Sequence, residues 1–498
     1  MLTSIGLAVI VFAAYWLAVE LAKRSGVLER YNITAYGPVL LIRTKKGLGF
    51  LEKLARWRRF WKVLADLGLP AVFLGMAFMF ALLLYADYIM VTNPPKPSIL
   101  TSPRAALLIP GINPFIPIVW GTIGLIVTLV VHEFSHAILC RVEGVSVKSL
   151  GVILALIPFG GFAEPDESEL MDKKKTSRAA RVRIFSAGVI VNFVVAAVAF
   201  ATFVHLLGML QPLVVIVGDN GTVDGVVLEV NGQQVRLPED VYEAVKGTDR
   251  VYMLVSNESG VHELVVPNVM GVKVVGLYRE DSKTFPAEQA GMKEGMVIVE
   301  IDGEAVRNHS DFQRIMSKMK PGQNVTVRVY HNGSFEVYNV TLTDMNGRGF
   351  LGVYVQLFDC IDGISIAYSG NLLQSLRSTP QYLTSVAGWL YLISMPFRFQ
   401  GFMSDYAKLF EAPEWVFWVL NTLYWIGWIN FYVGLFNCLP AIPLDGGRVF
   451  HEAFSYLLAR RYGDRAEEIS MRIVKTFAFI VFFSILLSIA VPNLEGLI

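Results

Sequence analysis

Three ionisable side chains stand close together in the segment His132-Glu133-Phe134-Ser135-His136. A helix places His132 and His136 on one face, one turn apart. That spacing allows two imidazoles to bind one Zn²⁺, and a glutamate next to the first histidine can act as general base toward water on the metal. The motif therefore predicts hydrolytic metal chemistry.

This motif lies inside an apolar run from Pro117 to Leu139 that is long enough to cross a bilayer as a helix. Ionisable side chains within a spanning helix are costly, so three of them together favour a functional site. The alternative is that the two histidines and the glutamate only pair with one another inside a helix bundle.

A catalytic zinc site needs a third protein ligand and one open position. The next histidine, His205, lies at the far end of a later apolar segment, whereas residues 436–448 (FNCLPAIPLDGGR) offer the carboxylate of Asp445 after another apolar segment. Prolines and glycines at membrane depth are tolerated where they line a cavity, and a carboxylate suits a site with two histidines. The alternative is a plain loop at a membrane exit with an exposed Asp445.

Composition indicates a polytopic membrane protein with a sizeable soluble part, because 54% of the 498 residues are hydrophobic and 17% are charged. The formal net charge of +1 gives no electrostatic basis for binding nucleic acid. The cysteines Cys140, Cys360 and Cys438 form no CxxC pair, which excludes a disulfide framework and a zinc site of four cysteines. Cys140 and Cys438 are interpreted as small buried side chains, with metal ligation as the alternative.

Hydropathy predicts about six membrane spans, and the positive-inside rule orients them. Basic residues concentrate in residues 23–62, 141–183 and 448–472, and an outer N-terminus places all three segments in the cytosol. Residues 382–399 are apolar but hold Pro396 and Arg398, so we expect an interfacial helix there. The predicted spans are Leu2–Leu21, Leu67–Met90, Ile118–Cys140, Ile184–Leu207, Val416–Phe436 and Ile473–Val491.

Between the fourth and fifth predicted spans, residues 211–362 alternate apolar and polar positions as strands do. The sequence LEVNG at 228–232 is echoed by VEIDG at 299–303, which indicates a tandem of two small domains outside the membrane. The second copy, Phe285–Val340, resembles a PDZ domain of bacterial proteases through Pro286-Ala287, Ala290-Gly291 and Asp302-Gly303. The first copy matches only from Asp224 on, which indicates a degenerate or circularly arranged domain.

The PDZ resemblance implies a peptide or the terminus of a substrate ectodomain as a partner, because PDZ domains add an extended peptide to a sheet edge. A rigid spacer or a size filter that binds nothing is an equal alternative, since fold does not settle function.

HExxH in one span and NxxPxxxxDG after another together resemble the double signature of the site-2 protease family of intramembrane zinc metalloproteases. Gly188 and Asn192 match the GxxxN element of that family, and residues 157–162 (IPFGGF) resemble its membrane-associated hairpin. The resemblance covers nearly all of the chain apart from extra spans at both ends.

The resemblance implies that His132, His136 and Asp445 hold one zinc ion per chain. It implies that Glu133 takes a proton from water and passes it to the leaving amine. The residues it implies for contact with the substrate backbone or the developing oxyanion are Asn192, Asn437, Phe159, Gly160, Gly161 and Phe162.

We therefore expect a polytopic α-helical membrane protein with an inserted extracytoplasmic PDZ-like α+β region, located in the plasma membrane with its active site toward the cytosol. The expected function is an intramembrane zinc metalloendopeptidase that cuts transmembrane substrates in regulated intramembrane proteolysis. The alternatives are a membrane-anchored metalloprotease for soluble or peripheral peptides and a non-catalytic PDZ scaffold. The expected domains are 1–115 (first spans and basic loop), 116–210 (first part of the catalytic core), 211–362 (tandem PDZ-like region), 363–415 (interfacial linker helices) and 416–498 (second part of the core and last span).

Overall fold

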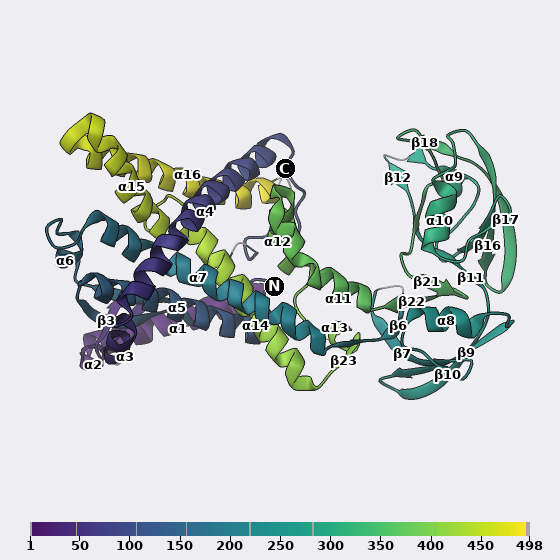
Figure 1. The fold of residues 1–498 in the computed structure, drawn as a ribbon, viewed down its shortest axis with the longest axis horizontal. Coiled ribbons are helices and arrows are strands. Elements are labelled where there is room, and N and C mark those ends of the chain that lie inside the picture. The colour runs from purple at the N-terminus through teal and green to yellow at the C-terminus, as the bar shows by residue number, and fades with distance from the viewer. Residues whose placement is uncertain are drawn as a thin grey trace. The chain divides into compact units, whose positions relative to one another are not determined.

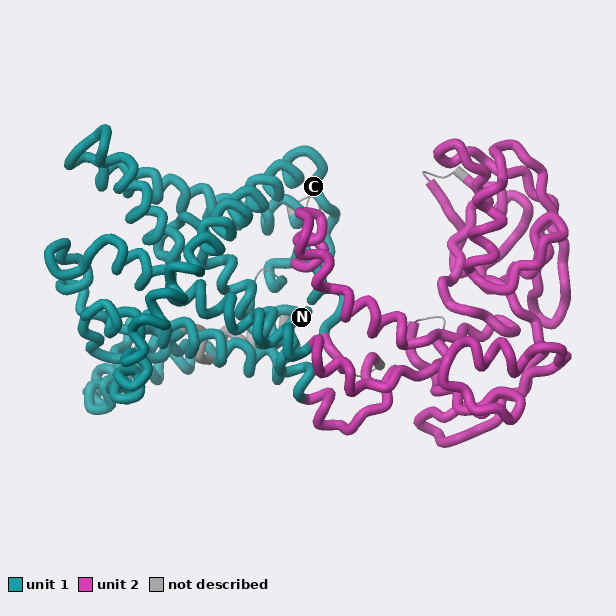
Figure 2. Tube along the Cα trace, in the orientation of Figure 1, with its two compact units in different colours: residues 1–203, 394–400, 419–498 teal, residues 204–393, 401–418 magenta. Residues whose placement is uncertain are grey.

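The computed structural model describes residues 2–45, 47–105, 107–155, 157–218, 221–280, 283–403 and 405–494. The chain divides into two units (Figure 2). Unit 1 comprises residues 1–203, 394–400 and 419–498, and unit 2 comprises residues 204–393 and 401–418. Unit 1 holds the HExxH segment and Asp445, whereas unit 2 holds the inserted region.

Long apolar helices make up most of unit 1 (Figure 1). Within the described residues, four segments are long and apolar enough to cross a membrane. They are α4 (Arg58–Thr92), α5 (Ile118–Glu143), α7 (Arg178–Leu206) with the turn that follows it, and α15 (Asp445–Tyr462) joined to α16 (Ala466–Leu494).

The remaining two predicted spans also form helices, α1 (Leu2–Arg24) and α14 (Glu414–Asn437). The tryptophans, tyrosines and asparagines of α14 lower its mean hydropathy, which suits a helix that packs among others better than one that faces lipid. The total of six spans stays a prediction.

Glycines allow the helices of unit 1 to approach closely. A Cβ atom built at Gly68 of α4 would lie 2.5 Å from the Ile190 side chain of α7, and one built at Gly124 of α5 would lie 2.8 Å from the Trp425 carbonyl oxygen of α14. Small residues at such contacts are the usual means of packing helices tightly in membranes. The resulting core buries residues of α4, α5 and α7 together.

A four-stranded antiparallel sheet in unit 1 has the order β1-β2-β3-β4. The strands β1 (Ile33–Tyr36) and β2 (Val39–Thr44) precede α3 (Leu48–Ala55), and β3 (Val147–Ala155) and β4 (Ile157–Pro165) precede the short helix α6 (Glu167–Met171). Strand β4 is therefore an edge strand, with one side free of β-pairing in this sheet.

Unit 2 contains a continuous antiparallel sheet whose main path is β10-β9-β7-β6-β22-β21-β11-β14-β16-β17. Its first half packs against α8 (Pro238–Val245), and its second half packs with α10 (His309–Met316). The strands of the main path are β6 (Val214–Val217), β7 (Val223–Val230), β9 (Arg250–Asn257), β10 (Gly260–Pro267), β11 (Met270–Leu277), β14 (Val297–Ile301), β16 (Asn324–His331), β17 (Ser334–Thr341), β21 (Asp359–Ile361) and β22 (Ile364–Tyr368).

The second PDZ-like copy is inserted into the first. Strand β22 follows the second copy in the chain but pairs with β6, which precedes the first copy. The core of the first copy accordingly includes Ile361 and Ile366. This arrangement explains why the first copy matches its pattern only in part, and it carries the sheet beyond the boundary expected at residue 362.

The segment expected at the membrane surface forms a 3-10 helix over Thr379–Thr384 and the helix α12 over Val386–Arg398. With 13 residues, α12 is shorter than the roughly 20 residues that a helix needs to cross a bilayer.

Candidate active site

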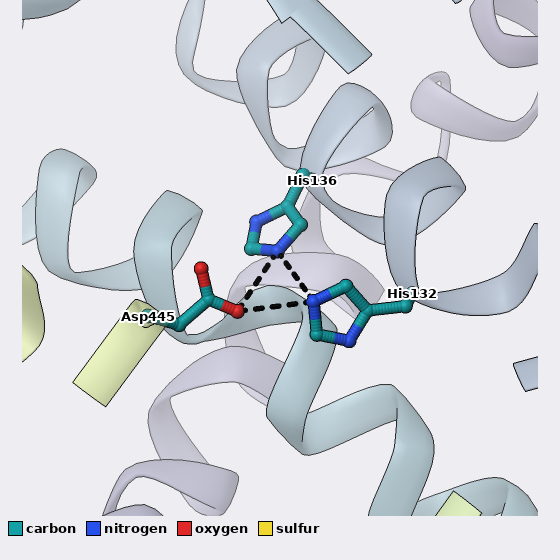
Figure 3. Close-up of side chains that lie close together, drawn as sticks. All are labelled: His132, His136 and Asp445. Carbon is teal, nitrogen blue, oxygen red and sulfur yellow. Dashed lines mark hydrogen bonds and ion pairs between the residues drawn. The ribbon is translucent and has the colours of Figure 1, made fainter. Parts of the chain in front are cut away.

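Two imidazoles converge on one face of α5. The Nε2 atoms of His132 and His136 lie 3.3 Å apart (Figure 3). Helix α5 begins after Pro117 and ends at Gly144, whose φ of 86° is the left-handed conformation that glycine adopts readily after a helix. Both histidines therefore belong to one uninterrupted helix, as their spacing predicts.

Asp445 is the first residue of α15, and its Oδ2 atom lies 3.1 Å from Nε2 of each histidine (Figure 3). Its side chain is only 15% exposed. The chain folds back tightly before this helix: a Cβ atom at Gly446 would lie 2.5 Å from the Leu439 carbonyl oxygen, and one at Gly447 would lie 2.6 Å from the backbone of Ala441. These two glycines let the turn present Asp445 to α5.

The three donor atoms form a nearly equilateral triangle with sides of 3.1–3.3 Å and belong to a group that could hold a metal ion. A tetrahedral zinc ion with bonds of about 2.0–2.2 Å separates its ligands by roughly 3.3–3.6 Å. Two imidazole nitrogens and one carboxylate oxygen are a zinc donor set that leaves a fourth position for water or substrate. The residues therefore fit a catalytic zinc ion.

Helix α7 lines the other side of the imidazoles with residues spaced four apart. The carbonyl oxygen of Ile184 lies 2.7 Å from Nδ1 of His136, so a protonated Nδ1 donates to it and Nε2 is left as a ligand atom. A Cβ atom at Gly188 would lie 2.5 Å from Nε2 of both His132 and His136. Only glycine therefore fits at this position without displacing the histidines.

Asn192, one turn beyond Gly188, is fully buried, and its amide lies 3.1 Å from Nδ1 of His132. Its Oδ1 atom has no hydrogen-bond partner within the described residues. Rotating the amide by 180° presents Oδ1 to a protonated Nδ1 of His132 and leaves Nε2 of His132 free as a ligand atom. In the structure Asn192 contacts a histidine, and the contact with substrate that the family resemblance implies stays a prediction.

Glu133 follows His132 directly and is half-buried. Its Oε2 atom accepts a hydrogen bond of 3.0 Å from the backbone N–H of Ala163 in β4. A Cβ atom at Gly161 would lie 2.9 Å from Cγ of Glu133, so the absence of a side chain lets β4 approach the glutamate. The edge strand and the expected general base are therefore in contact.

The other expected substrate residues lie on two elements. For Phe159 and Gly160 only the backbone, in β4, lies within the described part of the structure. The Phe162 ring packs over Gly151 of β3, and Asn437 is the partly exposed last residue of α14. The structure thus brings the histidines, Asp445, Glu133 and Asn192 together, with β4 alongside.

Several groups in this site carry no sequence signal. The carbonyl of Ile184 and the N–H of Ala163 are backbone groups, which every residue type supplies. Ile184 could have been found only from its position four residues before Gly188. The ion pair between Arg181 and Glu452 joins residues 271 positions apart, and neither belongs to a motif.

Comparison with protein families gives a match over most of the chain. The model of peptidase family M50 matches residues 120–481, which include both histidines, Glu133 and Asp445.

Individual relatives are similar at low identity. The chain is 23% identical to the uncharacterized protein MJ0971 of Methanocaldococcus jannaschii over 87% of this chain and 83% of that protein. It is 23% identical to the regulator of sigma-E protease RseP of Salmonella typhimurium over 72% of this chain and 95% of that protein. It is 25% identical to the zinc metalloprotease RasP of Shouchella clausii over 35% of this chain and 41% of that protein.

Among solved structures, the PDZ domain of an SdrC-like protein from Listeria monocytogenes is 28% identical over 17% of this chain and 86% of that domain, with a TM-score of 0.15.

Proposed function

This chain belongs to peptidase family M50, and on that premise we propose that it is an intramembrane zinc metalloendopeptidase that cleaves transmembrane segments of other membrane proteins. The observation that carries the proposal is the triangle of His132, His136 and Asp445, with Glu133 beside it. Two relatives, a zinc metalloprotease and a regulator of sigma-E protease, support the same chemistry and suggest regulated intramembrane proteolysis.

The chemistry follows from the groups in the site. A bound zinc ion would supply a Lewis acid and lower the pKa of water toward neutrality. Glu133 accepts a proton at its carboxylate and delivers it to the leaving nitrogen of the cleaved peptide bond. The hydrogen bond from Ala163 holds this carboxylate in place, next to the ligand His132.

Strand β4 supplies the surface for the substrate. A helix hides its scissile carbonyl in an intrahelical hydrogen bond, so a transmembrane substrate must unwind locally before attack. The free edge of β4 offers backbone groups to an unwound segment, and Asn437 offers an amide at the end of α14. Pairing with β4 would set the scissile bond beside Glu133.

The active site and the PDZ-like region belong on opposite sides of the membrane in this proposal. We place the active site toward the cytosol and the PDZ-like region outside the plasma membrane, where it meets a peptide or the ectodomain terminus of a substrate. The inserted copies suit this role because PDZ domains add peptides to sheet edges.

Glu133→Gln tests the proposal, because glutamine keeps the shape of the side chain but cannot accept the proton. We expect about one zinc per chain, an unchanged melting temperature and a cleavage rate lower by roughly 10²–10⁴-fold on a single transmembrane peptide in detergent. His136→Ala should lose the zinc as well.

Two results would contradict the proposal. Full cleavage by Glu133→Gln at unchanged zinc content would remove its role as base. Cleavage of soluble peptides but not of the transmembrane peptide would instead favour a membrane-anchored protease for soluble substrates.

A further inference from the structure

A buried ion pair joins the helix that lines the imidazoles to the helix that begins with Asp445. Arg181 of α7 donates from Nε to Glu452 Oε1 at 2.6 Å and from Nη2 to Glu452 Oε2 at 2.9 Å. The two side chains are 5% and 8% exposed. The remaining Nη1 of Arg181 donates to the Thr176 carbonyl at 2.8 Å, so the guanidinium is held in one orientation.

The ion pair lies the same number of residues from the proposed metal site along α7 as along α15. Glu452 lies seven residues after Asp445 on α15, and Arg181 lies seven residues before Gly188 on α7. Seven residues are two turns, or about 10.5 Å of helix. Two contacts, separated by two turns on each helix, therefore relate α7 to α15. At one, Gly188 and the histidines face Asp445. At the other, Arg181 faces Glu452.

The neighbouring arginine ties α5 to the same turn of α7. Arg183 donates to Glu143, which lies seven residues after His136, at 3.1 Å, and to Asp66 of α4 at 2.7 Å and 3.0 Å. The helix with the histidines and the helix with Asp445 are thus both fixed to one turn of α7. A slip of α15 by one residue would move Asp445 by about 1.5 Å and rotate it by about 100°.

We propose that Arg181 and Glu452 are positioning residues, whose bidentate ion pair sets the register of α15 so that Asp445 reaches the ion held by His132 and His136. This inference rests on the metal site of the proposed function. A fork-shaped guanidinium suits the role, because it fixes both distance and orientation to a carboxylate, whereas lysine offers one point charge.

The test measures metal binding rather than cleavage. The full chain in detergent is titrated with Co²⁺, whose visible absorption reports ligand geometry, against a competing chelator. Arg181→Lys and Glu452→Gln should bind Co²⁺ about 10–100-fold more weakly, with shifted absorption bands, at a temperature where both are folded. Arg178, whose Nε lies 3.5 Å from Oε2 of Glu452, stays beside this side chain in both variants.

Lys173→Gln is the matched control. This substitution breaks the ion pair of Lys173 with Glu467 of α16, in which the two side chains are 66% and 45% exposed. It should leave the Co²⁺ affinity and the absorption spectrum unchanged.

Wild-type affinity and spectrum in both folded variants would overturn the inference and leave the pair as a stabilising contact. If Glu452→Gln does not fold, the Co²⁺ affinity and spectrum of Arg181→Lys, which keeps the charge, test the inference by themselves. Failure of the wild-type chain to bind Co²⁺ would refute the metal site itself and the inference with it.

Discussion

Gly188 shows how strongly the site depends on a missing side chain. Gly188→Ala would place a Cβ atom 2.5 Å from Nε2 of His132 and His136, so the imidazoles or α7 must move. Overpacking of this kind typically costs about 1–3 kcal/mol, and here it acts directly on two donor atoms of the proposed zinc site. We expect Zn²⁺ affinity to fall at least tenfold, measured by chelator competition.

Gly49→Ala is the control for that substitution, because a Cβ atom at Gly49 in α3 meets nothing within 4 Å. Alanine there should leave affinity unchanged. Equal affinities for the two alanine variants would mean that α7 does not constrain the histidines.

Among single residues, the sequence predicts those site residues whose chemistry depends on their spacing along the chain. The i to i+4 spacing of His132 and His136 suffices to predict their common face, and proline and glycine around Asp445 mark a turn. The contact between Asn192 and His132 is not accessible in the same way, because an amide can bond substrate or imidazole equally well. Its contact with His132 depends on how α7 packs on α5.

The four-stranded sheet is the element that presents β4 to the site. The ring of Phe162 in β4 packs over Gly151 in β3, and the Arg43 guanidinium of β2 lies 5.7 Å from the same ring. Arg43 also pairs with Glu164 of β4 at 3.3 Å. Residues 33–44, which precede the part matched by the family model, thus support the strand that contacts Glu133.

Gly151→Ala should disturb β4 without touching the proposed metal ligands. A Cβ atom there would overlap the Phe162 ring and lie 2.6 Å from the Ile42 carbonyl oxygen. If β4 pairs with substrate, KM for a transmembrane peptide should rise about tenfold while Zn²⁺ affinity stays the same.

Val152→Ala, at the neighbouring exposed position of β3, should change neither quantity. A Gly151→Ala enzyme with the KM of the wild type would argue against substrate pairing at β4.

At the scale of elements, the sequence predicts types better than connections. Apolar length predicts α4, α5, α7 and α16, and alternation predicts the strands of unit 2. No local pattern encodes the nesting of the two PDZ-like copies, because the pairing of β22 with β6 joins segments about 150 residues apart. The family suggested by the two motifs is confirmed by the match to peptidase family M50.

Across the whole molecule, the expected topology can be tested with single cysteines, since the three native cysteines are buried. A membrane-impermeant thiol reagent added to intact cells should label a cysteine at Asn257 in unit 2 and spare one at Lys53 in α3, both exposed positions. The positive-inside rule is the reason, because Lys53 belongs to a basic segment. Labelling of Lys53→Cys alone would invert the assigned orientation.

The role of the PDZ-like region is tested by its removal, and the sheet defines where to cut. Strand β22 pairs with β6, so a deletion of residues 211–362 would leave β22 with an unpaired edge, whereas a deletion of residues 211–368 removes both strands.

If the region excludes substrates with large ectodomains, the 211–368 deletion with a short linker should keep Zn²⁺. It should also cut substrates with full-length ectodomains that the full chain rejects. If the region is a required docking site, the deletion variant should cleave substrates with shortened ectodomains at least tenfold more slowly than the full chain does. Unchanged rates for both substrates at unchanged zinc content would contradict either role and leave the region as a spacer.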